Sequence, residues 1–340
     1  MSTTTDTLNK APAAKKKRSV ALLFSRHPET GALIVAAALI VVFGVTSGGV
    51  WLNTGNLQSI LHVTAILAIL AAGEALVICT GEIDISIGSI LGMGAFVFLG
   101  AAPLVGVLPA VVLAIATGCA IGAFNGYISS YLGISSLIVT LGTLFIFRGL
   151  AYMLSEGWPF QIDTATRASL ALYDWFGAGT IFGYQNSILW MLLVVAALHV
   201  TMFYTRLGNR LLAIGGHKES ALSRGVRVRF VRFLAFVLAG ACAAFAGVLA
   251  ANRIGFADGT TGRLMELEAI AACVVGGCLL AGGRISIIGA LAGAFILSGI
   301  QSYLVIMGVS PQFYLMVLAG LVIAALLSDN RLRAWAVRRR

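Results

Sequence analysis

The sequence predicts an all-α polytopic membrane protein with about ten transmembrane helices. Of its 340 residues, 59% are hydrophobic, only 11% are charged and 40 are glycine. A soluble domain of this length carries about a quarter charged residues. Apolar runs of about 17–25 residues, the length that a helix needs to cross a bilayer, recur along the chain. These observations indicate a protein that spans the membrane many times.

Ten apolar runs are long enough to be predicted spans. They lie at residues 31–51, 58–79, 86–102, 104–124, 136–154, 187–204, 231–251, 265–282, 286–307 and 311–327. Residues 1–30 are polar and basic, and we expect this cytoplasmic segment to be disordered. The predicted transmembrane domain covers 31–328, and 329–340 form a basic tail.

The positive charge supports a definite topology. The formal net charge is +10, and the cations gather at 15–18, in the loop around 205–230, and in the tail. Lys and Arg are retained on the cytoplasmic face of a membrane. A cytoplasmic N-terminus places the 205–230 loop, after six predicted crossings, and the C-terminus, after ten, in the cytoplasm as well. Basic flanks of this kind contact membrane lipid and argue against nucleic-acid binding.

Two glycine-rich regions interrupt the apolar pattern, TGEIDISIGSILGMGAF at 80–96 and ACVVGGCLLAGGRISIIGALAGA at 272–294. Short, glycine-interrupted segments in the two halves of a transporter predict broken helices around a central pathway. Gly88, Gly276 and Gly277 are the candidate breaks. The tripeptide Ile-Ser-Ile occurs in both regions, but three residues are too few to establish a repeat.

Ionisable residues inside the predicted spans are candidates for the pathway, because each costs about 2.5–3.5 kcal/mol at a bilayer centre. Glu74 lies within the second span and Arg148 late in the fifth, where it can snorkel or pair with an acid. Asp84 lies at the first break, with Ser86 beside it. Asp84 either accepts N–H bonds at the start of the next helix or serves substrate passage directly. The sequence leaves both roles open.

Signatures of enzymes do not occur. The chain has no G-x-x-x-x-G-K-[ST], H-E-x-x-H or G-x-S-x-G motif. Its four histidines and five cysteines are too scattered to predict a metal site. We therefore expect a non-catalytic chain with no catalytic residues, metal or cofactor of its own.

The basic loop in the middle of the chain predicts a rigid handle. Gly215 and Gly216 would open, and Gly225 would close, a short helix around 218–223 that carries Glu219. A soluble motor protein can dock on such a helix. The alternative is a basic loop that merely lies on anionic lipid headgroups.

Four segments, in order along the chain, resemble the signatures of sugar-importing ABC permeases of the ribose, xylose and autoinducer-2 branch. They are TGEIDISIG at 80–88, NGYISSYLGISSLIVTLGTLFIFRGLAY at 125–152, RLGNRLLAIGGHKESALSRGV at 206–226, and ELEAIAACVVGGCLLAGGRISIIGALAGA at 266–294. The chain departs from the family pattern in several places. Glu82 replaces a glycine, His217 replaces an asparagine, Arg224 changes a Leu-Ser-Gly pattern, and a proline is absent at Ser135-Ser136.

The resemblance implies a permease of the bacterial inner membrane that imports a sugar or sugar-like solute and works as a dimer with a second copy or a paralogue. It implies two further partners, a cytoplasmic ATPase that binds ATP and a periplasmic sugar-binding protein. The residues that it assigns to ATPase coupling are Gly215, Gly216, His217, Glu219, Arg224 and Gly225, and it adds Asn125 to the pathway candidates. The alternative is a stand-alone secondary transporter with Glu74 and Asp84 as proton or cation sites. The sequence does not name the solute.

Overall fold

A computed structural model describes residues 29–177, 179–181, 183–310 and 312–324. The predicted segment up to residue 28 and the predicted tail at 329–340 lie outside these residues. The long helices are α2 (Glu29–Thr46), α3 (Thr54–Cys79), α4 (Ile87–Val105), α5 (Val107–Tyr131), α6 (Ser136–Ser155), α8 (Asn186–Tyr204), α11 (Val228–Ile254) and α13 (Ile287–Ile306). The shorter ones are α7 (Thr164–Ser169), α9 (Arg206–Gly216), α10 (Lys218–Ser223) and α12 (Met265–Val275), with 3-10 turns η1 (Val50–Leu52) and η2 (Tyr173–Phe176).

The predicted fold class is confirmed. In the described part of the chain, eight apolar helices of 18 to 27 residues are long enough to cross a membrane, and each coincides with a predicted span. The span predicted at 265–282 is helical only in its first part, and residues 276–286, which follow it, are non-helical. Helix α12 has only 11 residues, which corresponds to about 17 Å, roughly half the thickness of the hydrocarbon core. The tenth predicted span is described as a shorter helix over Gln312–Ala324.

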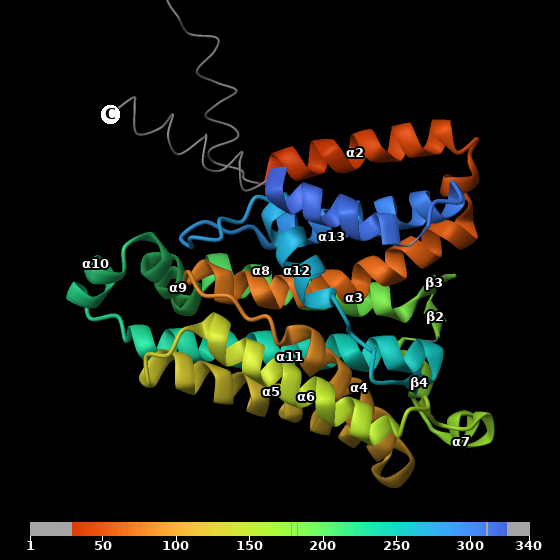
Figure 1. The fold of residues 1–340 in the computed structure, drawn as a ribbon, viewed down its shortest axis with the longest axis horizontal. Helices are drawn as coiled ribbons and strands as arrows, with labels where there is room; N and C mark the ends of the chain where they lie inside the picture. The colour runs from red at the N-terminus through yellow and green to blue at the C-terminus, as the bar shows by residue number, and fades with distance from the viewer. Residues whose placement is uncertain (1–28, 178, 182, 311, 325–340) are drawn as a thin grey trace, which may run out of the picture.

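Helix α11 lies at the centre of the bundle and packs against α3, α4 and α5. Helix α13 packs between α3 and α2, α12 lies against α3 and α13, and α6 covers α4 (Figure 1). Helix α3 is the most enclosed of the long helices, since 89% of its most apolar window is buried. The polar side chains of His62, Thr64 and Glu74 in α3 are therefore enclosed by protein.

Small residues bring α5 and α11 into backbone contact. Gly118 and Gly122 lie one turn apart on α5, and a Cβ on them would meet the carbonyl oxygens of Gly240 and Phe236 on α11. Small residues at such spacing let membrane helices pack closely. This contact encloses the neighbouring Asn125 side chain, which is fully buried.

The two ends of the bundle differ (Figure 1). Helices α9 and α10 extend beyond one end. The other end carries α7 and four two-residue strands, in which β1 (Phe160–Gln161) pairs with β4 (Phe256–Ala257) and β2 (Thr180–Ile181) pairs with β3 (Tyr184–Gln185). The basic loop at 205–230 and the acidic, aromatic loop at 155–186 thus lie at opposite ends.

Candidate functional site

Helices α9 and α10 form the predicted handle, residues 206–223 (Figure 1). Thr205 caps α9, because its hydroxyl oxygen accepts a hydrogen bond from the Gly208 N–H at 3.5 Å. One face of α9 is buried in the bundle through Leu211 and Ile214. Helix α10 spans the predicted residues and is followed by Gly225 with a φ of 77°. Only glycine adopts this backbone conformation without strain.

The expected turn at Gly215 and Gly216 is wrong. Both glycines lie in the last turn of α9, and neither has a positive φ. The break falls one residue later, at His217, where the backbone is extended with a φ of −153°. His217, Glu219 and Arg224 are all exposed around α10. They are accessible to a partner, and their role in coupling stays a prediction.

Gly215 is instead required by packing. A Cβ on this residue would collide with the carbonyl oxygen of Cys79, at the end of α3, and with the backbone of Gly283, between α12 and α13. The Gly283 N–H also donates to the Cys79 carbonyl at 3.0 Å. We call this meeting of three backbones, at Cys79, Gly215 and Gly283, the glycine junction. It attaches the handle directly to the loops that contain both predicted helix breaks.

Both breaks are present in the structure. Helix α4 begins at Ile87 after a non-helical stretch from 80 to 86. Helix α12 ends at Gly276, and Gly277 follows with a φ of 93°. The first turns of α4 and α12 meet inside the bundle, since a Cβ on Gly88 would collide with the Glu266 carboxylate. Two interrupted helices therefore face each other, as in transporters with a central binding site.

The Asp84 carboxylate organises the first break. Its Oδ1 accepts hydrogen bonds from the Ser86 N–H at 2.8 Å and from the Ser86 hydroxyl at 2.5 Å. The Asn125 amide donates to the same hydroxyl at 2.8 Å, and the Asp84 N–H donates to Glu74 Oε1 at 3.0 Å. All four residues are fully buried. The Asp84 carboxylate thus accepts an N–H bond from the residue that precedes α4, and Ser86, not Asp84, is the N-cap residue of that helix. Both roles weighed for Asp84, helix capping and substrate passage, stay predictions.

This buried network keeps unused hydrogen-bonding capacity. Glu74 Oε2, Asp84 Oδ2 and Asn125 Oδ1 are buried, and none has a hydrogen-bond partner among the described residues. Buried polar atoms are normally paired, so exceptions point to a functional role or to bound water. The network thus places polar groups beside the point where the interrupted helices meet.

Arg148 joins α6 to the loop that leads into α12. Its guanidinium donates to the carbonyl oxygens of Thr261 at 2.7 Å and Gly259 at 3.4 Å. Neither expectation for Arg148, snorkelling or pairing with an acid, describes these bonds, because both acceptors are backbone carbonyls. Arg148 therefore holds the non-helical segment before α12 in place.

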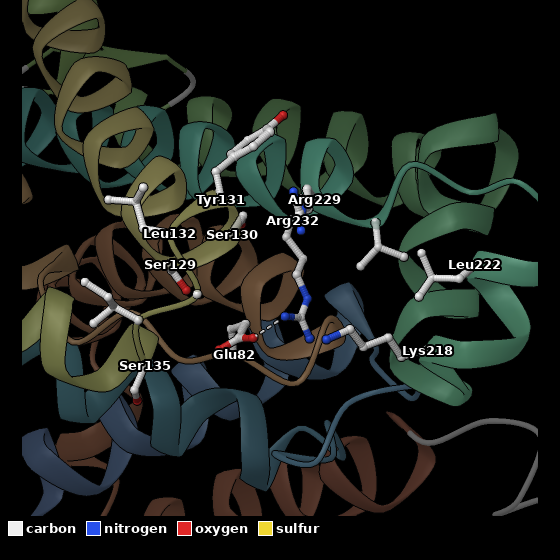
Figure 2. Close-up of a pocket in the computed structure, with 13 residues that line it drawn as sticks. Glu82, Ser129, Ser130, Tyr131, Leu132, Ser135, Lys218, Leu222, Arg229 and Arg232 are labelled. Carbon is white, nitrogen blue, oxygen red and sulfur yellow. Dashed lines mark ion pairs between the residues drawn. The ribbon is translucent and has the colours of Figure 1, made fainter.

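Glu82 connects the first helix break to α11 and α6, and Figure 2 shows its ion pair with Arg232. Its carboxylate pairs with the Arg232 guanidinium of α11 at 2.6 Å and accepts a hydrogen bond from the Ser136 hydroxyl of α6 at 2.7 Å. Arg232 also donates to the Thr80 carbonyl at 3.3 Å. Sequence reasoning did not identify Arg232 or Ser136. The available signal was Glu82 itself, an acid where the family pattern has a glycine.

A cavity of about 570 Å³ opens beside this ion pair. It lies between the α5–α6 loop, α10 and the first turn of α11, and its cations are Lys218, Arg229 and Arg232 (Figure 2). Within the described part of the chain, Glu82 is the one acid in its lining. The cavity is therefore strongly cationic and lies at the handle end of the molecule.

The opposite end is ordered by short polar contacts. Asp163 caps α7, since its carboxylate accepts from the Thr166 N–H at 2.9 Å. Hydrogen bonds from the Thr166 hydroxyl and N–H lower the pKa of the exposed Asp163 carboxyl below its ordinary value. The Arg167 guanidinium lies 5.0 Å from the centre of the Tyr173 ring. Through these contacts the aromatic loop forms a defined surface.

The chain is similar to known proteins over almost its whole length. The family model described as "branched-chain amino acid transport system / permease component" matches residues 56–326, from α3 to beyond α13. The chain belongs to this permease family. The matched residues contain the handle, the glycine junction and both helix breaks, so these features lie in the family's own domain.

The permease has close relatives in enteric bacteria. It is 35% identical over 307 residues to the ribose import permease protein RbsC of Escherichia coli strain K12, covering 89% of this chain and 94% of RbsC. It is 31% identical over 328 residues to the D-allose transport system permease protein AlsC of the same strain, covering 94% and 97%. The autoinducer 2 import system permease protein LsrC of Salmonella typhimurium strain LT2 is 35% identical over 316 residues, covering 92% and 88%. No solved structure matches the permease.

Proposed function

We propose that the permease is the membrane subunit of an ATP-binding-cassette importer in a bacterial inner membrane. It carries a sugar or sugar-like solute into the cytoplasm, and a separate subunit binds and hydrolyses the ATP. RbsC and AlsC are named for ribose and D-allose, which are neutral polyhydroxylated solutes. These relatives favour a sugar over the amino acids in the family description.

The observation that carries this proposal is the attachment of the handle. Helix α10 projects from the bundle with exposed polar residues, and a partner protein can bind this helix in a groove. Helix α9 connects it to the glycine junction, where backbones touch without intervening side chains. Close-packed interiors transmit displacements because they do not compress. A movement of α10 therefore shifts the end of α3 and the loop before α13.

The solute passes where the interrupted helices meet, near Gly88 and Glu266. Asp84, Ser86 and Asn125 hold the start of α4 there, and Arg148 holds the segment before α12. Hydroxyl, amide and carboxyl groups are suited to hydrogen-bond a neutral sugar. The permease alternates between two arrangements of these helices, and the ATPase biases their populations.

The remaining partners follow from the two ends of the molecule. The basic handle end faces the cytoplasm, as do both termini. A periplasmic sugar-binding protein docks on the opposite, aromatic end, around α7 and η2. A second copy or a paralogue completes the pathway, as the resemblance to dimeric sugar-importing permeases implies.

Co-purification tests the proposal. The full-length permease is expressed with its candidate ATPase subunit, as wild type and as Glu219→Arg on α10. Glu156→Arg is the matched control, since Glu156 is an exposed acid at the opposite end. The ATPase should co-purify with the wild type and the control, and Glu219→Arg should reduce its retention. Equal retention by all three proteins would exclude docking on the handle.

A further inference from the structure

The cavity beside the Glu82–Arg232 ion pair has a surplus of positive charge. Glu82 is its only acid among the residues that the structure describes, and this carboxylate is already engaged by Arg232 at 2.6 Å and by Ser136 at 2.7 Å. Lys218 and Arg229 form no ion pair within the described part of the chain. Two uncompensated cations on one cavity attract an anion.

The cavity also holds hydrogen-bond donors with nothing to donate to. The Ser130 hydroxyl is buried, with the residue only 9% exposed, and it has no partner among the described residues. Arg232 Nε is likewise buried and without a partner there. Buried donors of this kind cost free energy unless a ligand or water accepts from them. Figure 2 shows the Lys218 ammonium and the Arg232 guanidinium directed into the same space.

The rim of the cavity is apolar. Tyr131, Leu132 and Ile134 belong to its lining, and they are 39%, 59% and 45% exposed. They lie where α5 ends, at the depth at which a membrane helix leaves the hydrocarbon core, and tyrosine is enriched at this interface. A ligand that fits both parts has an anionic head and an apolar body.

We propose that this cavity binds one anionic phospholipid, with the headgroup phosphate between Lys218, Arg229 and the Ser130 hydroxyl. The acyl chains lie along Leu132 and Ile134. Basic pockets between membrane helices are known to select such lipids. The site requires that the chain spans a membrane, and it does not depend on the solute that is transported.

The lipid also joins elements that move relative to each other in the proposed transport cycle. Lys218 belongs to the handle, Arg229 to α11, and Ser130 to α5. A phosphate held by all three ties α10 to the bundle. Bound anionic lipid therefore restricts the handle in the permease itself, before any ATPase is present.

The test measures lipid retained by the delipidated, full-length permease in a neutral detergent, using native mass spectrometry. The probes are dioleoyl phosphatidylglycerol, dioleoyl phosphatidylcholine and inorganic phosphate. We expect one phosphatidylglycerol per chain. The Lys218→Gln/Arg229→Gln double variant should bind it about thirtyfold more weakly, equivalent to about 2 kcal/mol for two cations. Ser130→Ala should weaken binding by a smaller factor.

Arg206→Gln/Arg210→Gln is the matched control, since it removes two exposed cations from the same end of the molecule but outside this cavity. Phosphatidylglycerol binding should change less than threefold in this control. Equal loss in both double variants, equal retention of phosphatidylcholine, or equally tight binding of inorganic phosphate would each overturn the proposal. So would a cavity that binds no lipid but becomes protected when the ATPase docks, because the occupant would then be a protein.

Discussion

The Glu82–Arg232 ion pair offers the sharpest test of how the first helix break is held. We expect Glu82→Gln to destabilise the permease by about 2 kcal/mol. The two side chains are 18% and 17% exposed and 2.6 Å apart, so the pair lies between two limits. An exposed pair is worth about 0.2–1 kcal/mol, and removing one partner of a buried pair costs about 3–5 kcal/mol. The unfolding entropy of a chain of this length converts 2 kcal/mol into a fall in Tm of about 3 °C.

Unfolding of the purified permease in detergent measures this effect. Arg206→Gln is the control, because Arg206 is an exposed cation at the same end, outside the cavity and without an ion pair among the described residues. A double-mutant cycle of Glu82→Gln and Arg232→Gln should give a coupling energy of about 1–2 kcal/mol. Effects that add to within about 0.5 kcal/mol would refute the interaction. A Glu82→Gln Tm equal to that of Arg206→Gln would refute it as well.

Three further outcomes follow from the same geometry. Asp84→Asn keeps the oxygen that accepts from Ser86 and should leave Tm nearly unchanged, while Asp84→Leu should lower the free energy of unfolding by about 3 kcal/mol. An Asn variant that is stable but inactive in transport would show that the charge of Asp84 serves transport. Gly215→Ala should overpack the glycine junction and lower the free energy of unfolding by about 1–3 kcal/mol, whereas Gly216→Ala, with open space around it, should not destabilise the permease. Equal Tm values for the two variants would contradict the close backbone packing at the glycine junction. Impermeant maleimide applied to intact cells should label a single cysteine at Ala168 and not one at Ser220, and the opposite result would reverse the topology.

Local patterns in the sequence predicted the local features well. The end of α10 before Gly225, the interrupted regions and the start of α4 follow from glycines, acids and apolar runs that lie next to each other in the chain. The Ile-Ser-Ile tripeptides even mark equivalent positions, since Ser86 and Ser286 are the N-cap residues of α4 and α13. The residues at which a helix begins and ends are determined largely by a few neighbouring residues.

Other features were not predictable, for physical reasons. Gly215 was expected to bend the chain, but its requirement comes from Gly283 and Cys79, which are far away in the sequence. Arg232 likewise gains its partner, Glu82, only through folding. Contacts across the bundle are set by tertiary packing and carry no local signal.

ATP-dependent uptake by the reconstituted system tests the central claim most directly. The permease is placed in proteoliposomes with its ATPase subunit, and the binding protein is added outside with labelled ribose as the first candidate solute. The account predicts uptake that requires all three proteins and ATP, that persists when ion gradients are collapsed, and that is lost with Gly215→Val but not with Gly216→Ala. Uptake by the permease alone, driven by a proton or sodium gradient and abolished by Asp84→Asn, would contradict it.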